Sequence, residues 1–404
     1  MSEVLFLAHR IPFPADRGDK IRSNHLLHAI AARWPVHVGC LGDDAADMAQ
    51  EQALAKLAVS HCLVRRSTPL PLCALQALAS GLSVSLTAFD SARLRRYTAQ
   101  VLATRPITTI FVFSGQMAQF VPASFEGRVV MDFVDVDSAK FEAYAQTGML
   151  PRRSLYAREG RLMRRFEERT ARRADCSLFI TREEQALFEA RLAAPGAADV
   201  RALGNGIDAA LFDPALVAPA PELAGQGAKI VFTGQMDYPP NVAAVEYFTL
   251  AVMPLIRAAR ADASFHIVGR APTASVLALS GINGAQVTGA VPDVRPWLAG
   301  ADLVVAPLKI ARGVQNKVLE AMAMARPVLL TSSAAAGIAA RDGEHFAIAD
   351  GASALAASAL DLLGNPARAA ALGAAARRFV TDHCSWAQML AALPEILLGH
   401  ADAA

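Results

Sequence analysis

Short, continuous runs of apolar residues alternate with longer stretches of helical periodicity along nearly the whole chain. In the first half, the runs that we expect to form strands are residues 4–8, 36–40, 109–113, 129–133 and 176–180. In the second half they are residues 229–233, 264–268, 285–288, 303–306, 328–331 and 345–348. Apolar strands separated by helices are typical of parallel sheets that helices cover on both faces. The pattern therefore predicts an α/β protein.

Proline and alanine accumulate in residues 211–221, and two glycines follow at Gly225 and Gly227. A composition of this kind is typical of a segment that joins two domains. The length of 404 residues is enough for two or three domains that each bury a core. We therefore predict two Rossmann-like halves joined by this segment.

Composition and charge narrow the class of protein. The net charge of +2 argues against a general affinity for nucleic acid. No run of about 18 uninterrupted apolar residues is present, and the first residues lack the basic start of a signal peptide, so we predict neither a transmembrane span nor a secretion signal. The five cysteines are odd in number and lack C-x-x-C spacing, which suggests neither a zinc site nor a disulfide framework. We expect a cytoplasmic protein.

The strongest indication of a ligand-binding site lies in residues 313–331, where we expect a polar loop, a helix and a buried strand to follow one another. The strand at residues 303–308 should deliver its carboxyl end to this loop, and open α/β sheets bind ligands beyond the carboxyl ends of their strands. Lys317 and Glu320 are one helical step apart on one face, where they could hold a phosphate and a sugar hydroxyl. The alternative is an ordinary surface ion pair worth a few tenths of a kcal/mol.

A second candidate is the loop of residues 9–22, which carries a strand into a helix that we expect to begin near Gly18. Glycine allows close backbone approach there, and a helix N-terminus attracts anions. Arg17, Lys20 and Arg22 would strengthen that field. A proline-rich surface loop with solvated basic residues explains the same pattern.

Three carboxylates, Asp132, Asp135 and Asp137, come at the carboxyl end of a predicted strand. Such a cluster could bind a divalent metal or act as a general base on an acceptor hydroxyl. The glycine and glutamate of a calcium loop are missing, so calcium is rejected. We expect Asp135 and Asp137 to face an acceptor and Asp132 to be structural, with capping of the next helix by Asp137 as the rival explanation.

Residues 232–241 form a fourth candidate, in which a strand ends in Thr-Gly at the start of a helix. This arrangement suits a pyrophosphate, whereas a rigid turn at the two prolines after Tyr238 is the alternative. This region offers Gln235, Tyr238 and Asn241, which carry no charge at pH 7. The neutralisation of a diphosphate would therefore depend on Arg270, Lys309 and Lys317.

Together these segments resemble the family 4 glycosyltransferases of the GT-B fold. The segment at 313–331 is similar to their E-x7-E-A-M-A-x-G-x-P-V element, in which Glu320 matches the second glutamate while Arg312 stands at the first. The sequences His-Arg-Ile-Pro-Phe-Pro from His9, Asp-Val-Asp-Ser from Asp135 and Thr-Gly-Gln-Met-Asp-Tyr from Thr233 are most similar to the sugar transferases associated with the PEP-CTERM/exosortase system.

This resemblance implies a retaining glycosyltransferase that uses a nucleotide-diphosphate-sugar donor as co-substrate, with no other cofactor and no obligatory metal. The acceptor would be a glycan or a lipid-linked molecule in exopolysaccharide biosynthesis. The implied catalytic residues are Asp135, Asp137 and His9. The implied donor-binding residues are Gly18, Gly234, Gln235, Arg270, Val291, Asn316, Lys317 and Glu320, with Glu320 on the ribose and the segment around Val291 on the nucleobase.

The resemblance also implies the roles of the domains. Residues 1–200 would form an N-terminal acceptor-binding domain and residues 201–380 a C-terminal nucleotide-sugar-binding domain, the two facing each other across a cleft. Residues 381–404, which include Trp386, would form a C-terminal helix that crosses back to the first domain.

Residues 152–173 hold nine arginines against three glutamates, with an apolar stripe at Leu155, Leu162 and Phe166. A basic amphipathic helix could rest on anionic lipid headgroups, which would place the protein at the inner face of the cytoplasmic membrane. A solvated face whose stripe packs on its own sheet is the more frequent explanation, and we favour it.

Two other functions remain open at this point. A nucleotide-sugar 2-epimerase has the same two-lobed architecture and would interconvert the donor sugar without an acceptor. A noncatalytic protein that binds sugar nucleotides is suggested by Arg312 at the position of the first glutamate.

Overall fold

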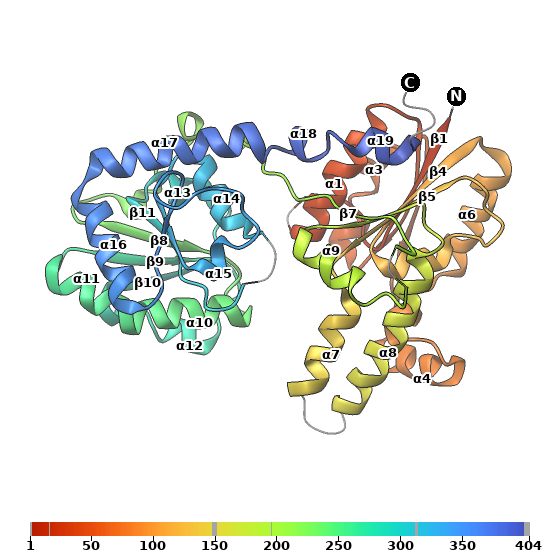
Figure 1. Cartoon of the computed structure of the whole chain (residues 1–404), viewed down its shortest axis with the longest axis horizontal. Helices are drawn as coiled ribbons and strands as arrows, with labels where there is room; N and C mark the ends of the chain where they lie inside the picture. Colours follow the sequence, from red (N-terminus) through yellow and green to blue (C-terminus); the bar gives the residue numbers. More distant parts are fainter. Residues whose placement is uncertain (1, 16, 148–151, 195, 312–313, 400–404) are drawn as a thin grey trace. The chain divides into compact units, whose positions relative to one another are not determined.

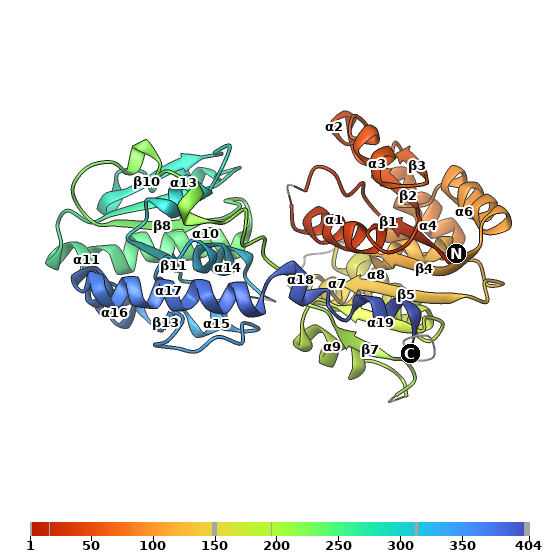
Figure 2. The same ribbon diagram turned by 90° about the horizontal axis from the view of Figure 1, so that it is seen from above.

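The computed structural model describes residues 2–15, 17–147, 152–194, 196–311 and 314–399. The chain divides into two compact units, Met1–Gly204 with Leu390–Ala404 and Asn205–Met389. In each unit a parallel sheet lies between helices (Figures 1 and 2). The predicted fold class of two Rossmann-like α/β domains is confirmed.

The N-terminal unit contains a seven-stranded parallel sheet with the order β3-β2-β1-β4-β5-β6-β7. Its strands are β1 (Glu3–Ala8), β2 (Val36–Gly42), β3 (Ser60–Arg65), β4 (Ile107–Phe113), β5 (Arg128–Val134), β6 (Cys176–Phe179) and β7 (Val200–Ala202). Its helices are α1 (Gly18–Ala31), α2 (Ala45–Met48), α3 (Glu51–Leu57), α4 (Leu70–Ser80), α5 (Val84–Ala88), α6 (Ala92–Thr104), η1 (Gly115–Phe120), α7 (Asp137–Thr147), α8 (Arg152–Ala171), α9 (Arg182–Glu189) and α19 (Leu393–Leu398).

The C-terminal unit contains a six-stranded parallel sheet with the order β10-β9-β8-β11-β12-β13. Its strands are β8 (Lys229–Thr233), β9 (Ser264–Val268), β10 (Ala285–Gly289), β11 (Leu303–Ala306), β12 (Val328–Leu330) and β13 (Ala347–Ile348). Its helices are η2 (Pro214–Leu216), η3 (Pro221–Leu223), α10 (Pro239–Tyr247), η4 (Phe248–Val252), α11 (Met253–Ala259), α12 (Ala274–Leu277), η5 (Ile282–Gly284), α13 (Arg295–Ala299), α14 (Asn316–Ala323), α15 (Ser332–Ala335), α16 (Ala352–Gly364), α17 (Pro366–His383) and α18 (Trp386–Met389).

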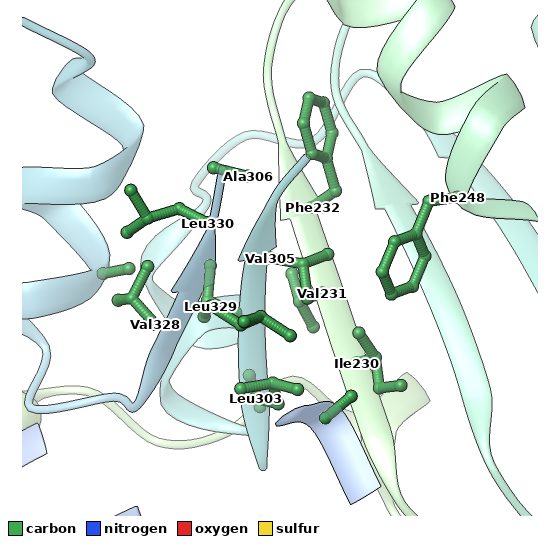
Figure 3. Close-up of a cluster of buried hydrophobic side chains, with 14 of the residues drawn as sticks. Ile230, Val231, Phe232, Phe248, Leu303, Val305, Ala306, Val328, Leu329 and Leu330 are labelled. Carbon is green, nitrogen blue, oxygen red and sulfur yellow. The ribbon is translucent and has the colours of Figure 1, made fainter. Parts of the chain in front are cut away.

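The core of the C-terminal unit shows why its strands are apolar along their whole length. Ile230 and Phe232 on β8 are fully buried, and so is Val231 between them, because helices cover both faces of the sheet. Figure 3 shows these side chains beside Leu303 and Val305 of the neighbouring β11. Burial on both faces fixes the strand positions and thereby the places at which the loops leave the sheet.

Every strand that the apolar pattern predicts is present, although β13 is shorter than expected. The pattern missed two strands, β3 and β7, which are the two edge strands of the N-terminal sheet. An edge strand needs less continuous apolar sequence because it has only one neighbouring strand. In β3 only Cys62 and Leu63 are buried, and β7 has three residues.

One helical run, Pro239–Ala259, is long and apolar enough to cross a membrane, among the residues that the structure describes. Val245, Phe248, Val252 and Ile256 of this run are fully buried in the core of the C-terminal unit. Packing against the sheet therefore accounts for its apolar composition.

The C-terminal segment contributes to both units. Gly206 packs directly on the backbone of Trp386, where an added Cβ would lie 2.5 Å from the Trp386 nitrogen. Farther along, α19 packs on β4 and β5, with the Leu397 carbonyl accepting a hydrogen bond from the Thr109 hydroxyl and the Ile396 carbonyl accepting one from Arg128. The last helix is thus part of the N-terminal unit.

Candidate functional site

The order of the strands identifies one edge in each sheet where a ligand can bind. In the N-terminal unit β1 lies between β2 and β4, and in the C-terminal unit β8 lies between β9 and β11. The chain continues from β1 to β2 on one side and from β4 to β5 on the other, so it leaves the neighbours β1 and β4 in opposite directions. The neighbours β8 and β11 are the corresponding pair in the second sheet. Such a pair opens a crevice at the carboxyl ends of its two strands. A ligand is therefore expected at that edge of each sheet.

His9 directly follows β1, and its ring stacks on Phe113 at the end of β4 with 5.7 Å between the ring centroids. Its Nε2 lies 3.2 Å from the Asp19 carboxylate, which also accepts a 2.6 Å hydrogen bond from Arg10. Burial lowers the pKa of His9 and outweighs the opposing effect of Asp19. The ring is therefore neutral at pH 7, and its buried Nδ1 has no hydrogen-bond partner among the described residues.

Asp137 begins α7 close to this histidine. The Gln116 side-chain amide donates a 3.0 Å hydrogen bond to its carboxylate, and an electrostatic interaction links it to His9. Burial raises the pKa of Asp137. A carboxylate that is oriented by a hydrogen bond and lies near a neutral histidine is a suitable general base.

Asp135 follows β5 and differs from Asp137 in being exposed. The surrounding protein still partly desolvates its carboxylate, and repulsion from Glu184 and Asp137 adds to this effect, so its pKa is raised to about 6. The structure thus brings His9, Asp135 and Asp137 to the carboxyl ends of β1 and β5, which flank β4 in the sheet.

The backbone at this edge is strained in two places. Ser114 after β4 has a φ of 78° and Val134 at the end of β5 has a φ of 72°. Positive φ is rare for residues other than glycine and especially unfavourable for a β-branched one. Strain of this kind is found preferentially at functional sites, which supports the choice of this edge.

The predicted helix after the first loop begins at Gly18, and its N-cap residue Arg17 makes no side-chain capping bond. An added Cβ at Gly18 would meet nothing within 4 Å. Packing inside the unit therefore does not require glycine at this position, although a ligand approaching the helix N-terminus would still benefit from it.

Of the cations predicted to attract an anion to residues 9–22, Arg17 is the N-cap residue of α1, and Lys20 and Arg22 are buried in ion pairs. Lys20 donates a 2.5 Å hydrogen bond to Asp47, and Arg22 donates a 2.9 Å hydrogen bond to Asp132. Arg22 and Asp132 are 1% and 0% exposed, so both charges are neutralised inside the unit. Asp132 is structural, as expected, and of the three cations Arg17 retains the most exposed side chain.

Lys317 is the centre of the candidate site in the C-terminal unit. It lies at the second position of α14, and its Nζ donates a 2.5 Å hydrogen bond to the Asn241 side chain and lies 4.3 Å from the centroid of the Phe232 ring. Burial lowers its pKa to about 7. Since no carboxylate pairs with it among the described residues, Lys317 is a half-buried cation placed to receive an anion.

Two glycines make room for this lysine. An added Cβ at Gly234 would lie 2.8 Å from the Asn241 amide and 3.1 Å from the Lys317 Nζ. At Gly269 it would lie 1.6 Å from the Gly234 carbonyl oxygen. Only glycine allows the ends of β8 and β9 to approach so closely, and this leaves the Lys317 ammonium beside bare backbone.

Glu320 lies one helical step after Lys317 and is also half-buried. Burial raises its pKa to about 7, although Lys317 opposes the shift. The two side chains form no ion pair in the described part of the chain, because Lys317 is bonded to Asn241. This geometry disfavours the simple surface ion pair that the spacing alone would explain.

The remaining predicted donor residues also lie at or next to the carboxyl edge of this sheet. Arg270 follows β9 and donates a 3.2 Å hydrogen bond to the side chain of Gln235, which follows β8. Val291 follows β10, and Asn316 is the first residue of α14. Gly18 belongs to the other unit. Arg312 lies outside the described residues.

Sequence reasoning missed three residues of the N-terminal edge: Arg10, Asp19 and Gln116. Arg10 and Asp19 bracket His9, and Gln116 orients Asp137. A signal for Gln116 was present in the polar Ser-Gly-Gln sequence directly after the apolar strand at 109–113. The described residues hold no group of three His, Cys, Asp or Glu side chains that could bind a metal ion.

The arginine-rich segment forms the single helix α8. Of its predicted apolar stripe, Phe166 is buried, Leu162 is half-buried and Leu155 is exposed. Phe166 and Met163 pack against Leu86 of α5. Most of the stripe is thus used inside the unit, whereas the arginines between its members are mostly exposed.

Comparison with known proteins finds a family match within the C-terminal unit. Residues 227–365 match the family described as "Glycosyl transferases group 1". No curated protein matches the sequence.

Solved structures match over nearly the whole chain. The Anabaena protein Alr3699/HepE in complex with UDP and glucose has a TM-score of 0.68 at 15% identity, with 99% of this chain and 100% of that chain covered. A sucrose-phosphate synthase from Thermosynechococcus elongatus has a TM-score of 0.66 at 16% identity, with 98% of each chain covered. WaaG, a glycosyltransferase involved in lipopolysaccharide biosynthesis, has a TM-score of 0.64 at 18% identity, covering 98% of this chain and 100% of its own. The chain thus has the GT-B fold, and the stretch that matches the glycosyltransferase group 1 family lies in its C-terminal unit.

Proposed function

We propose that this protein is a retaining glycosyltransferase that moves a sugar from a nucleotide-diphosphate donor to a glycan or lipid-linked acceptor. The donor would bind at the carboxyl edge of the C-terminal sheet, and the acceptor at that of the N-terminal sheet. The observation that carries the proposal is Lys317, a half-buried cation without a carboxylate partner among the described residues, at the strand edge of a domain that matches glycosyltransferases.

The chemistry of this site fits a sugar diphosphate. Lys317 and the positive end of α14 would bind the diphosphate and stabilise the charge that develops on it as the sugar departs. Glu320 would accept a hydrogen bond from the ribose. Support for such a donor comes from the neighbouring structures, one of which is Alr3699/HepE in complex with UDP-glucose.

On the acceptor side, Asp137 is the group best placed to remove a proton from the attacking hydroxyl, since Gln116 orients it beside His9. Asp135 would contact the acceptor from the more exposed side. The resemblance to PEP-CTERM/exosortase sugar transferases supports a role in exopolysaccharide biosynthesis. A cytoplasmic location is supported by the five cysteines, which are all free.

The proposal is tested with a panel of UDP-, GDP- and ADP-sugars in a thermal-shift assay. A donor at about 100 times its Kd stabilises the protein by about 2.7 kcal/mol. For a domain of this size the unfolding midpoint should then rise by roughly 5–10 °C. Release of nucleoside diphosphate on addition of a lipid or glycan acceptor would complete the case.

Other results point elsewhere. If the donor alone is converted to a second sugar nucleotide, the protein is an epimerase. Tight donor binding without turnover on any acceptor would favour a noncatalytic binding protein. If no sugar nucleotide raises the midpoint, the proposed donor site is wrong.

Donor affinity should be highest near pH 7. The diphosphate prefers the protonated form of Lys317, whose pKa is about 7, so affinity should fall as the pH rises above 7. The ribose hydroxyl prefers ionised Glu320, whose pKa is also about 7, so affinity should fall as the pH drops below 7. Calorimetric titration between about pH 5.5 and 8.5 measures the fall in donor affinity on both sides of pH 7. Each fall should approach tenfold per pH unit. The Glu320→Gln variant should lose the fall in affinity below pH 7 and keep the fall above it.

A further inference from the structure

An uncharged, leucine-rich helix stands out on the surface of the N-terminal unit. Residues 67–89 contain no charged side chain, and α4 lies within them. Leu70, Leu75 and Leu78 are 64%, 64% and 60% exposed, and Leu72 and Leu82 are exposed as well. These five leucines, here called the leucine face, lie close together in sequence, four of them on α4 and Leu82 shortly after its end. They differ in this from the single exposed apolar residues that are normal on a protein surface.

The orientation of α4 is the reverse of that expected for a helix on a water-facing surface. Its buried residues are the small Cys73 and Ala77, one helical step apart, whereas the large leucines point away from the protein. Turning the helix over would bury the leucines, so this arrangement has a cost in water that a partner must offset.

Specific hydrogen bonds hold α4 in this orientation. Arg158 of α8 donates to the Ala77 and Leu82 carbonyls at 3.0 and 3.1 Å. The buried Glu159 accepts hydrogen bonds from the backbone N–H groups of Val84 and Ser85, at the start of α5. The α4–α5 pair is thereby fastened to α8, and α4 lies beside α8 in Figure 1.

The contact with α8 sets the leucine face beside a row of positive charge. Arg161, Arg165 and Arg169 follow Arg158 at helical steps of three or four residues, so they lie on the same side of α8, and Arg172 directly follows the end of the helix. Arg161 and Arg165 are exposed and form no ion pair among the described residues.

The acidic residues of α8 do not cancel this charge at the surface. Glu159 is turned inward to cap α5, and the buried Glu167 accepts a hydrogen bond from the Ser138 backbone N–H. The third, Glu168, is paired with Arg172. The row of arginines therefore presents a net positive charge next to the leucines.

We propose that the leucine face of α4 and the arginine row of α8 form a docking surface for an anionic lipid bilayer. The leucines would enter the headgroup boundary to a depth of about 5–10 Å, and the arginines would contact the phosphates. Apolar area beside unpaired cations fits this occupant better than a second copy of the chain, whose own arginine row would be brought close to the first. The proposal does not depend on glycosyl transfer, since docking requires no donor.

The test is co-sedimentation of the full-length protein with vesicles made of equal parts phosphatidylcholine and phosphatidylglycerol. Binding should be at least about tenfold stronger than to pure phosphatidylcholine. Leu75→Ser with Leu78→Ser should weaken it by about tenfold or more, because two leucines no longer enter the bilayer. Arg161→Gln with Arg165→Gln should weaken it similarly, and added salt should weaken the native protein's binding.

Controls come from residues of the C-terminal unit with similar exposure. Leu250 and Leu277 are 56% and 53% exposed, so Leu250→Ser with Leu277→Ser should change vesicle binding by less than about twofold. Arg341→Gln with Arg368→Gln is the control for the loss of two positive charges, although these two exposed arginines are paired with Glu344 and Asp361. Unchanged unfolding midpoints would show that all the variants are folded.

A second measurement locates the leucine face in the bilayer. The tryptophan of Leu75→Trp should be quenched by brominated lipids more strongly than the native tryptophans. The proposal is overturned if the leucine pair variant binds anionic vesicles as well as the native protein does. It is also overturned if, without lipid, the native protein is a dimer that the leucine substitutions convert to a monomer, because the face would then join two copies.

Discussion

Replacement of Lys317 by methionine is expected to weaken donor binding by about 100-fold or more, since removal of one partner of a buried charge contact typically costs 2–5 kcal/mol. Methionine keeps the length of the side chain and its contact with Phe232 but removes the ammonium group. The change in Kd is measured by calorimetric titration with the best sugar nucleotide. The native and variant proteins are compared at pH 6.5, where Lys317 of the native protein is mostly charged.

The same substitution separates a binding role from a structural one. Lys317 is held in a desolvated position without a carboxylate partner among the described residues, which is unfavourable for the free protein. We expect the methionine variant to unfold at the same temperature as the native protein or at a higher one. A lower unfolding temperature would indicate that the lysine supports the fold through Asn241.

A matched control is available on β8, the strand that ends just before Gly234. Lys229 is the first residue of β8, at the opposite end from Gly234, and its ammonium group contacts only the Gln226 carbonyl among the described residues. Lys229→Met should leave the donor Kd within about twofold, as is usual for surface substitutions. Equal effects of the two substitutions would contradict a specific diphosphate contact at Lys317.

The sheets of both units could be predicted because burial on two faces demands continuous apolar sequence. Ile230 and Phe232 show this in β8, where both faces of the strand are covered. The same physics explains the failure at β3, an edge strand in which polar residues such as His61 are tolerated. The pattern therefore predicts central strands well and edge strands poorly.

The candidate site was predictable where it depends on local spacing. The loop, the helix start and the positions of Lys317 and Glu320 all follow from one short segment, and α14 begins within one residue of Lys317. Long-range partners were not predictable from spacing. Arg22 finds Asp132 110 residues away in sequence, so a cation that the loop pattern offered to a ligand is buried.

The leucine face was hidden from sequence reasoning for a related reason. An apolar helical segment predicts burial, because most helices turn their large apolar residues inward. In α4 the bonds from Arg158 fix the opposite orientation, and these bonds join residues about 80 positions apart, as the separation of 81 between Arg158 and Ala77 shows. The outward direction of the leucines emerges only in three dimensions.

Replacement of Asp137 by asparagine is expected to lower the rate of sugar transfer to the acceptor by about 100-fold or more, the usual contribution of a general base. Asparagine has nearly the same shape and can still bond with Gln116, so the local structure should be retained. Donor affinity should stay within about twofold, because the proposed donor residues Lys317 and Glu320 belong to the other unit. Turnover is measured as release of nucleoside diphosphate at saturating donor.

The control for this substitution is Asp175→Asn, on the loop before β6 at the opposite end of the same sheet. The Asp175 carboxylate accepts a hydrogen bond from the Val129 backbone N–H. The side-chain oxygen of asparagine can accept the same bond, so turnover should be unchanged. If Asp135→Asn abolishes transfer and Asp137→Asn does not, the base is the exposed carboxylate and the contact with Gln116 is structural. If neither substitution slows transfer, neither carboxylate is the general base, and the role proposed for Asp137 and Asp135 is wrong.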